Sequence, residues 1–168
     1  MNTKELNRML RDRARMLGLC DQWYDGWEKK ETKQQLIEKY LRGIDFCIKH
    51  DYPNLDFIKA NFPKDLLIVN GIFVDENVDA SNLKTAVLLG QSKGGIIYNW
   101  QRCGNIYLRH NSDLTIEVTD GARIFIEIYE DSHLKVSADN YSKAFVYQHG
   151  GTVEAEGNVT VRDKRKAE

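Results

Sequence analysis

Imidazole and carboxylate side chains recur at corresponding places in the C-terminal half of the sequence. Counting four residues back from four aligned apolar positions gives Ser92, His110, Glu130 and His149. A carboxylate between two imidazoles can bind a transition metal, and histidines change charge near neutral pH. The pattern predicts a metal-binding or pH-sensitive ladder of His110, Glu130 and His149, with solvated corner residues as the alternative. The spacing also allows Gln148 to take the place of His149.

Aromatic side chains form a second candidate site in the same half of the chain. Five of them are predicted to lie on the outward face of β-strands: Tyr107, Phe125, Tyr129, Phe145 and Tyr147. Stacking would gather them into one strip, and an exposed apolar strip usually marks a docking surface. We expect the strip to seat the N-terminal helices. A protein partner or a carbohydrate that stacks on the rings is the alternative.

A loop near the N-terminus combines two tryptophans with two carboxylates. Its residues are Asp21, Trp23, Tyr24, Asp25 and Trp27. Large aromatic side chains dominate the packing of small helical units, so the main interpretation is a clasp between helices. A groove for a peptide or ligand at Trp23 and Trp27 is the alternative.

No motif assigns a reaction to these groups. The sequence contains no Ser/His/Asp order, HExxH, Walker-type loop or GxGxxG, so nucleophilic, metalloprotease and nucleotide chemistry have no starting point. We therefore predict no cofactor, and a protein that is not an enzyme.

The element that must position these side chains is a repeat. Four segments share a small pair or Ser-x before an apolar pair: GGIIYNWQRCGN, SDLTIEVTDGAR, SHLKVSADNYSK and GGTVEAEGNVTV. Superposing Ile96, Leu114, Leu134 and Val153 gives steps of 18, 20 and 19 residues. Such a period is typical of a β-solenoid, in which each coil buries its inward side chains against neighbouring coils.

Alternation along the strands predicts which side chains face the interior. The inward positions are Ile106, Leu108, Leu114, Ile116, Ile124, Ile126, Ile128, Leu134, Val136, Ala144, Val146, Val153 and Ala155. The segment NVTVRD begins one more coil that the chain leaves unfinished. The charged tail RDKRKAE is expected to guard this edge.

The first third of the chain is predicted to be helical. Three helices are expected: one from Asn2 or Thr3 to Leu17, one from the capping box Thr32–Gln35 to about Ile48, and one from Asn54 to Pro63. The apolar stripe of the first helix comprises Leu6, Met9, Leu10 and Leu17. From Leu66 the segment LLIVNGIFV indicates strands, and DENVDASN indicates a loop.

These elements predict an α+β fold with two parts. Residues 1–64 form a helical cap region, and residues 65–168 form a short right-handed parallel β-helix of about four coils. The three cysteines, Cys20, Cys47 and Cys103, have no metal-binding spacing and are expected to be buried, reduced thiols.

Composition excludes several classes of protein. Residues 1–64 carry 13 basic and 10 acidic side chains, hence +3, and residues 65–168 carry 11 and 15, hence −4. This offset is too small for a general nucleic-acid binder. The sequence has no apolar run that spans a membrane and no secretion signal. We therefore predict no nucleic-acid or membrane partner, and a location in the cytoplasm or in a phage particle.

The repeat region, about residues 86 to 163, resembles the single-stranded right-handed β-helices. Their members include bactofilin-type scaffolds, phage tail proteins and polysaccharide lyases. The segments LGLCDQWYDGW, GIDFCIKHDYP and GNIYLRHNSDLTIEV resemble uncharacterised proteins of gut bacteria and their phages or mobile elements. The bactofilin resemblance implies polymerisation through coil ends, although this chain carries a helical region instead of a disordered tail.

Two functions follow as hypotheses. The leading one is a non-enzymatic structural or partner-binding module, an assembly or adaptor protein that binds a protein partner or itself in a phage or mobile-element setting. The alternative is a carbohydrate-binding or carbohydrate-active protein that uses the outward aromatic residues together with Glu117, Glu127, Glu130 and Glu154.

Overall fold

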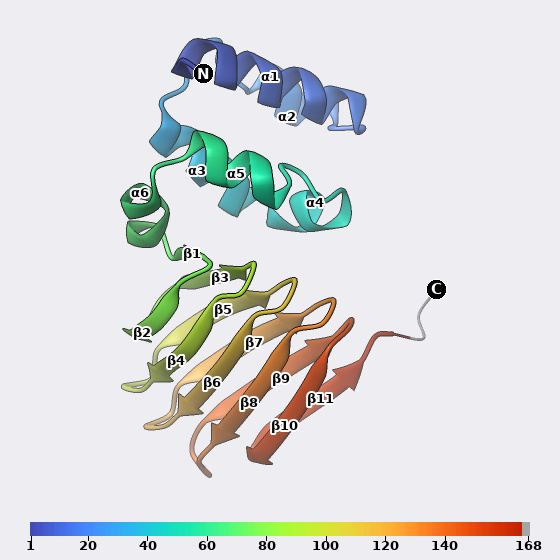
Figure 1. The fold of residues 1–168 in the computed structure, drawn as a ribbon. Helices are drawn as coiled ribbons and strands as arrows, with labels where there is room; N and C mark the ends of the chain where they lie inside the picture. The colour runs from blue at the N-terminus through green and yellow to red at the C-terminus, as the bar shows by residue number, and fades with distance from the viewer. Residues whose placement is uncertain (166–168) are drawn as a thin grey trace. The chain divides into compact units, whose positions relative to one another are not determined.

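The computed structural model describes residues 1–165, and the chain divides into two compact units, Met1–Leu67 and Ile68–Glu168. Helices come first along the chain and strands follow (Figure 1). The predicted α+β class is therefore confirmed.

Six helices lie at the start of the chain within the described residues. They are α1 (Thr3–Met16), α2 (Asp21–Asp25), α3 (Lys33–Arg42), α4 (Ile44–Lys49), α5 (Leu55–Asn61) and α6 (Lys64–Val69). Three of them begin at predicted caps, because the side chains of Asn2, Thr32 and Asn54 each accept a hydrogen bond from a backbone N–H three residues later. The caps of α1 and α3 are complete capping boxes.

The prediction of about three helices is confirmed for the longer ones, and the structure divides the region further. The helix expected from Thr32 to about Ile48 is divided at Gly43 into α3 and α4. Of the segment LLIVNGIFV that was expected to form strands, the first part belongs to the helix α6, which follows Pro63 and has Asp65 in its first turn, and Ile72–Val74 is a strand. Proline and an acidic residue both favour the start of a helix.

The buried stripe of α1 also differs from the prediction. Met9 is 46% exposed, whereas Asn7 and Ala14 are buried beside Leu6 and Leu10. A polar residue occupies the core position because both ends of its amide are bonded. The Asn7 Nδ2 donates to the Glu28 carbonyl, and its Oδ1 accepts from the Trp27 indole.

The second unit is a parallel β-solenoid of about four turns, as predicted. Its strands are β1 (Ile72–Val74), β2 (Asn77–Ser81), β3 (Thr85–Leu89), β4 (Lys93–Tyr98), β5 (Cys103–Leu108), β6 (Asp113–Val118), β7 (Arg123–Ile128), β8 (His133–Ala138), β9 (Lys143–Gln148), β10 (Thr152–Gly157) and β11 (Val159–Asp163). Residues expected to form a loop at DENVDASN include the strand β2.

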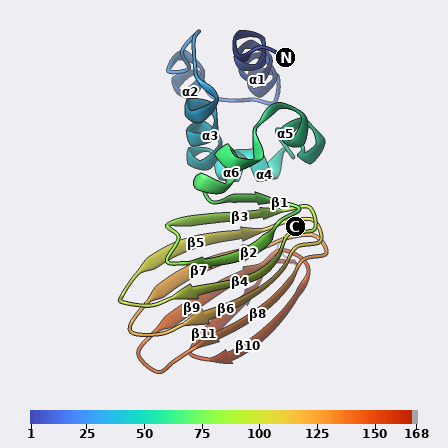
Figure 2. The same cartoon turned by 60° about the vertical axis from the view of Figure 1, so that its left-hand side comes forward.

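Two sheets share these strands. One has the order β1-β3-β5-β7-β9-β11, and the other has the order β10-β8-β6-β4-β2. Successive strands alternate between the sheets, so the chain winds through one strand of each sheet per coil (Figure 2). All pairings are parallel.

The register corrects the first step of the predicted repeat. Gly94 pairs with Leu114 and Leu114 with Leu134, so both steps are 20 residues, and Ile96 pairs with Ile116. The predicted inward stacking of Leu114 on Leu134 is confirmed, and both side chains are fully buried. The sequence pattern did not indicate this register, because β4 has Gly94 at the position where the next coils have an apolar residue.

The predicted inward side chains form one core cluster up to Val146. The widest inward side chain, Tyr98, fits because Gly104 lies beside it. A Cβ at Gly104 would lie 2.5 Å from the Tyr98 ring. The Tyr98 hydroxyl donates to the Leu83 carbonyl at 2.9 Å.

Two of the three cysteines depart from the prediction. All three are free thiols, but only Cys47 is buried, and Cys20 and Cys103 are exposed. Cys103 begins β5 at an outward position, so alternation alone exposes it.

Candidate functional site

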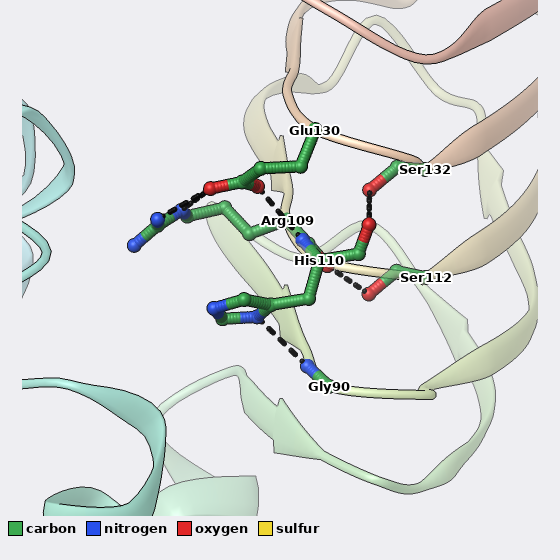
Figure 3. Close-up of polar contacts among 6 residues, drawn as sticks. All are labelled: Gly90, Arg109, His110, Ser112, Glu130 and Ser132. Carbon is green, nitrogen blue, oxygen red and sulfur yellow. Dashed lines mark hydrogen bonds and ion pairs between the residues drawn. The ribbon is translucent and has the colours of Figure 1, made fainter.

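Two members of the predicted ladder, His110 and Glu130, lie in one column, and each uses one polar atom to bind the backbone. His110 and Glu130 occupy the same corner of successive coils, each with a positive φ, and Gly90 has a positive φ in the coil before them. The His110 Nδ1 accepts a hydrogen bond from the Gly90 N–H at 3.0 Å. The Glu130 Oε2 accepts one from the His110 N–H at 2.8 Å (Figure 3). Each side chain thus caps the corner one coil earlier.

The register explains why Ser92 does not belong to this column. Because Gly94 rather than Ile96 is the partner of Leu114, the residue four places back is Gly90. Ser92 instead begins a second column with Ser112 and Ser132, and all three are buried. The Ser92 and Ser112 hydroxyls each donate to a backbone carbonyl of their own corner, Ser112 to Arg109 at 2.8 Å, and the Ser132 hydroxyl donates to the His110 carbonyl of the preceding coil (Figure 3).

The Glu130 carboxylate has a second partner at the same corner. Its Oε1 accepts from the Arg109 Nε at 3.1 Å, and the Arg109 guanidinium forms an ion pair with it (Figure 3). The Arg109 side chain is nearly buried, so this charge is held by its partner rather than by water alone. This ion pair joins the corners of two successive coils, as the hydrogen bonds to the backbone do.

His149 lies in a different group of side chains from His110. Its ring stacks on the Tyr129 ring, with centroids 4.5 Å apart, and its Nε2 lies 3.2 Å from the Glu127 carboxylate. The Tyr129 hydroxyl also donates to Glu127. Gln148 pairs with Ile128 at an inward position and is buried, so it does not join the ladder either.

The last corner is shorter than its predecessor, which displaces His149. Four residues separate Ile128 from His133, whereas three separate Gln148 from Thr152. Gly150 therefore takes the place beside Glu130, where a Cβ would lie 2.6 Å from the Glu130 nitrogen. Within residues 1–165, no group of three His, Cys, Asp or Glu side chains could hold a metal ion.

Four of the five predicted outward aromatic residues form two columns rather than one strip, and Tyr129 stacks on His149 instead. Phe125 pairs with Phe145 in the first, and Tyr107, Glu127 and Tyr147 follow one another in the second. The Phe125 and Phe145 rings are nearly parallel, with centroids 5.2 Å apart. Coplanar rings could not approach this closely, so the two rings turn their faces toward each other.

This stacking bears on the proposed carbohydrate surface. A sugar ring stacks on an open aromatic face, but one face of Phe125, Phe145 and Tyr129 is already occupied by a neighbouring ring. Nothing in the arrangement favours a carbohydrate over a protein partner. Phe125 remains 41% exposed. Coverage of the aromatic residues by the N-terminal helices stays a prediction.

The tryptophan segment that was predicted to be a loop is largely the helix α2, and it holds α1 in place. Trp27 donates its indole N–H to Asn7 at 2.7 Å, as a clasp would. Tyr24 lies beneath two guanidinium groups, those of Arg11 and Arg15. Trp23 is more exposed than Trp27 and takes no part in the Asn7 contact. Trp27 therefore acts within the fold, and a ligand role for Trp23 stays a prediction.

The fold shifts the pKa values of two buried tyrosines and of one exposed aspartate. Burial raises the pKa of the Tyr98 and Tyr52 phenols, and both hydroxyls donate to backbone carbonyls. The hydrogen bond from Ser142, with backbone bonds from residues 120, 141 and 142, holds the pKa of the exposed Asp139 carboxyl below its usual range. Each shift follows from a bond or burial that maintains the coils or helices.

The last coil, β10 and β11 with the turn between them, exposes side chains that its predecessors bury. Val153 and Ala155 pair with Leu134 and Val136, so both point inward as predicted. Ala155 is nevertheless exposed and Val153 only partly buried, and the inward Val161 is 41% exposed. Alternation predicts which way a side chain points but cannot predict whether the side chain is buried. Burial of these inward side chains requires another layer of residues stacked on the last coil.

The backbone of this coil is also paired on one side only. Among residues 1–165, β10 pairs with β8 and β11 with β9, and neither has a second neighbour (Figure 1). Thr152 and Lys164 donate their N–H groups to the preceding coil. The direction of the peptide groups alternates along a strand. The N–H and C=O groups that point away from the preceding coil are therefore those of Val153, Ala155, Val159 and Val161.

Comparison with known proteins yields no relative: no family model, curated protein or solved structure matches this chain. In the part of the chain that the structure describes, no helix is long and apolar enough to cross a membrane.

Proposed function

We propose that this protein is a non-enzymatic assembly module that binds a protein strand at its last coil. The observation that carries the proposal is the exposure of the inward Ala155 and Val161, when their register partners Val136 and Val146 are buried. The same coil has two open strand edges, β10 and β11, whose N–H and C=O groups point away from the preceding coil. An open edge beside an apolar layer is a template for strand addition.

The polar side chains support a structural role. Arg109, His110 and Glu130 are titratable side chains at the corners of two successive coils, and each bonds a neighbouring coil. Catalytic groups must instead reach a substrate with their donors or acceptors. The phage or mobile-element setting and the location in the cytoplasm or phage particle are part of this proposal.

Site-specific photo-crosslinking tests the proposal in the cells that produce the protein. A benzophenone side chain at position 161 should form an adduct with a protein, because this position lies on the open layer. The same group at position 135, on the exposed outer face of β8, should form none.

Proline substitution separates strand addition from simple proximity. Val161→Pro removes an N–H that points away from β9, so the β9–β11 ladder remains, as is usual for proline on an edge strand. This change should abolish the adduct from a benzophenone at position 155. Val161→Thr, which keeps the N–H, should retain it. Equal adducts from positions 161 and 135, or no adduct at all, would refute the proposal.

A further inference from the structure

We infer that the strand bound by the last coil belongs to a second copy of this chain, with β10 of one copy antiparallel to β11 of the other. The inference rests on the proposed function and names its partner. A twofold axis would form two identical β10–β11 pairs and cover both open edges at once. Closed twofold contacts of this kind are the commonest in homo-oligomers.

Charge selects this arrangement over the alternatives. The outward side chains of β10 include Glu154 and Glu156, and those of β11 include Thr160 and Arg162. Pairing β10 with a second β10 would place carboxylates opposite carboxylates. Pairing β10 with β11 places Glu154 or Glu156 opposite a guanidinium. Cross-strand pairs of opposite charge stabilise a sheet, and like pairs destabilise it.

The apolar layer and the backbone are consistent with one register. Ala155 opposite Val161 brings together two residues whose peptide groups point to the open edge. The same register places Glu154 opposite Arg162 on the outer face, at a non-hydrogen-bonded position where side chains are closest. The inward Val153, Ala155, Val159 and Val161 of both copies then meet in one layer, with Asp163, which is ion-paired with Arg165, opposite Val153 at its edge.

Existing contacts of the two charged residues do not oppose this pairing. Glu154 lies 3.2 Å from the His133 Nε2 but is 63% exposed. Arg162 lies over the Tyr147 ring at 5.7 Å. Both contacts are on the outer face of the sheet, so either side chain can reach a neighbour without leaving its strand.

Disulfide trapping tests the register directly. The full chain carries Cys20→Ser and Cys103→Ser, which remove the exposed thiols. One preparation then carries Glu154→Cys and the other Arg162→Cys. Opposite non-hydrogen-bonded residues in antiparallel strands have a Cα separation that a disulfide accepts. After mixing and oxidation, the disulfide between positions 154 and 162 should exceed both symmetric products. A predominant 154–154 product would overturn the arrangement.

Charge reversal provides a test that leaves the cysteines unchanged. Glu154→Arg should weaken the dimer about tenfold, since two like-charge pairs replace two opposite pairs. Adding Arg162→Glu to the same chain should restore the affinity, as measured by sedimentation. Glu117→Arg, on the outer face of β6, is the matched control and should leave the affinity unchanged. Failure of the second reversal to restore the dimer would contradict the Glu154–Arg162 pair.

The outcomes distinguish this inference from the proposed function. A protein that stays monomeric at every soluble concentration, while position 161 still cross-links to a different protein in cells, refutes the second copy and leaves the assembly module intact. Absence of any adduct at position 161 refutes both.

Discussion

The helical unit and the solenoid both satisfy exposed backbone groups with polar side chains, but over different distances along the chain. The side chains of Asn2, Thr32 and Asn54 each accept from an N–H three residues away. In the solenoid, His110 and Glu130 each accept from an N–H 20 residues away. The helix caps are complete within one turn, whereas a corner cap requires the preceding coil.

This difference teaches how a polar column can be misread as chemistry. A repeat places equivalent corners above one another, so side chains that cap the backbone also form columns. His110 above Gly90 and Glu130 above His110 have the composition of a metal ligand set, but their acceptors face N–H groups. A column of metal-ligating residue types is evidence for a metal site only when the ligand atoms of the side chains point toward one common position.

The largest effect should come from the solenoid core. Leu134→Ala removes a fully buried side chain between Leu114 and Val153 and should lower the free energy of unfolding by about 2 to 5 kcal/mol. Urea denaturation followed by circular dichroism measures the change. Ile97→Ala, an exposed position on β4, should cost about 0.5 kcal/mol or less. Equal costs would mean that the register of the core is wrong.

Alkaline pH should destabilise both the helical unit and the solenoid. Burial raises the pKa of Tyr52 in the helical unit and of Tyr98 in the solenoid above the unfolded value of about 10. The unfolded chain therefore loses its phenolic protons first. This stabilising term is complete below pH 10, and unfolding becomes more favourable as pH rises, by about 1.4 kcal/mol per pH unit for each phenol.

Single phenylalanine variants should assign this pH dependence to each unit. Tyr98→Phe removes the Tyr98 contribution and should flatten the decline of solenoid stability between pH 10 and 11. Tyr52→Phe should do the same for the helical unit. Tyr141→Phe is the control, because Tyr141 is exposed. The assignment fails if the Tyr141 variant flattens the profile as much as either buried one.

A corner cap should contribute less than a core side chain. His110→Ala leaves the Gly90 N–H without its acceptor and should cost about 1 to 2 kcal/mol. His110→Asn should restore most of this stability, because asparagine tolerates the positive φ of 64° and can supply an acceptor. Urea denaturation distinguishes the two variants. If asparagine costs as much as alanine, the His110 bond to Gly90 is not what stabilises the corner.

Short-range signals account for what could be predicted from the sequence. The caps at Asn2, Thr32 and Asn54 and the alternation from β5 to β9 each depend on residues that are neighbours in the chain. Gly43 as a helix break and Pro63 as a helix start were ambiguous, because the same residues also end helices or border strands. The environment of His149 could not be predicted, since it depends on the shorter corner before β10.

The smallest effect should come from a cap that is complete within one helix turn. Thr32→Ala removes the acceptor for the Gln35 N–H and should cost about 1 kcal/mol. Thr32→Ser keeps a hydroxyl at the cap and should restore most of that stability, while Thr115→Ala, on the exposed face of β6, should change little. Amide hydrogen exchange shows which residues lose protection in each variant. Because the cap bonds only its own helix, exchange should accelerate mainly in the first turn of α3, whereas His110→Ala should accelerate exchange in the coil before the mutation. Acceleration confined to residue 110 and its neighbours in the chain would show that corner caps act as locally as helix caps, and the contrast between the two units would disappear.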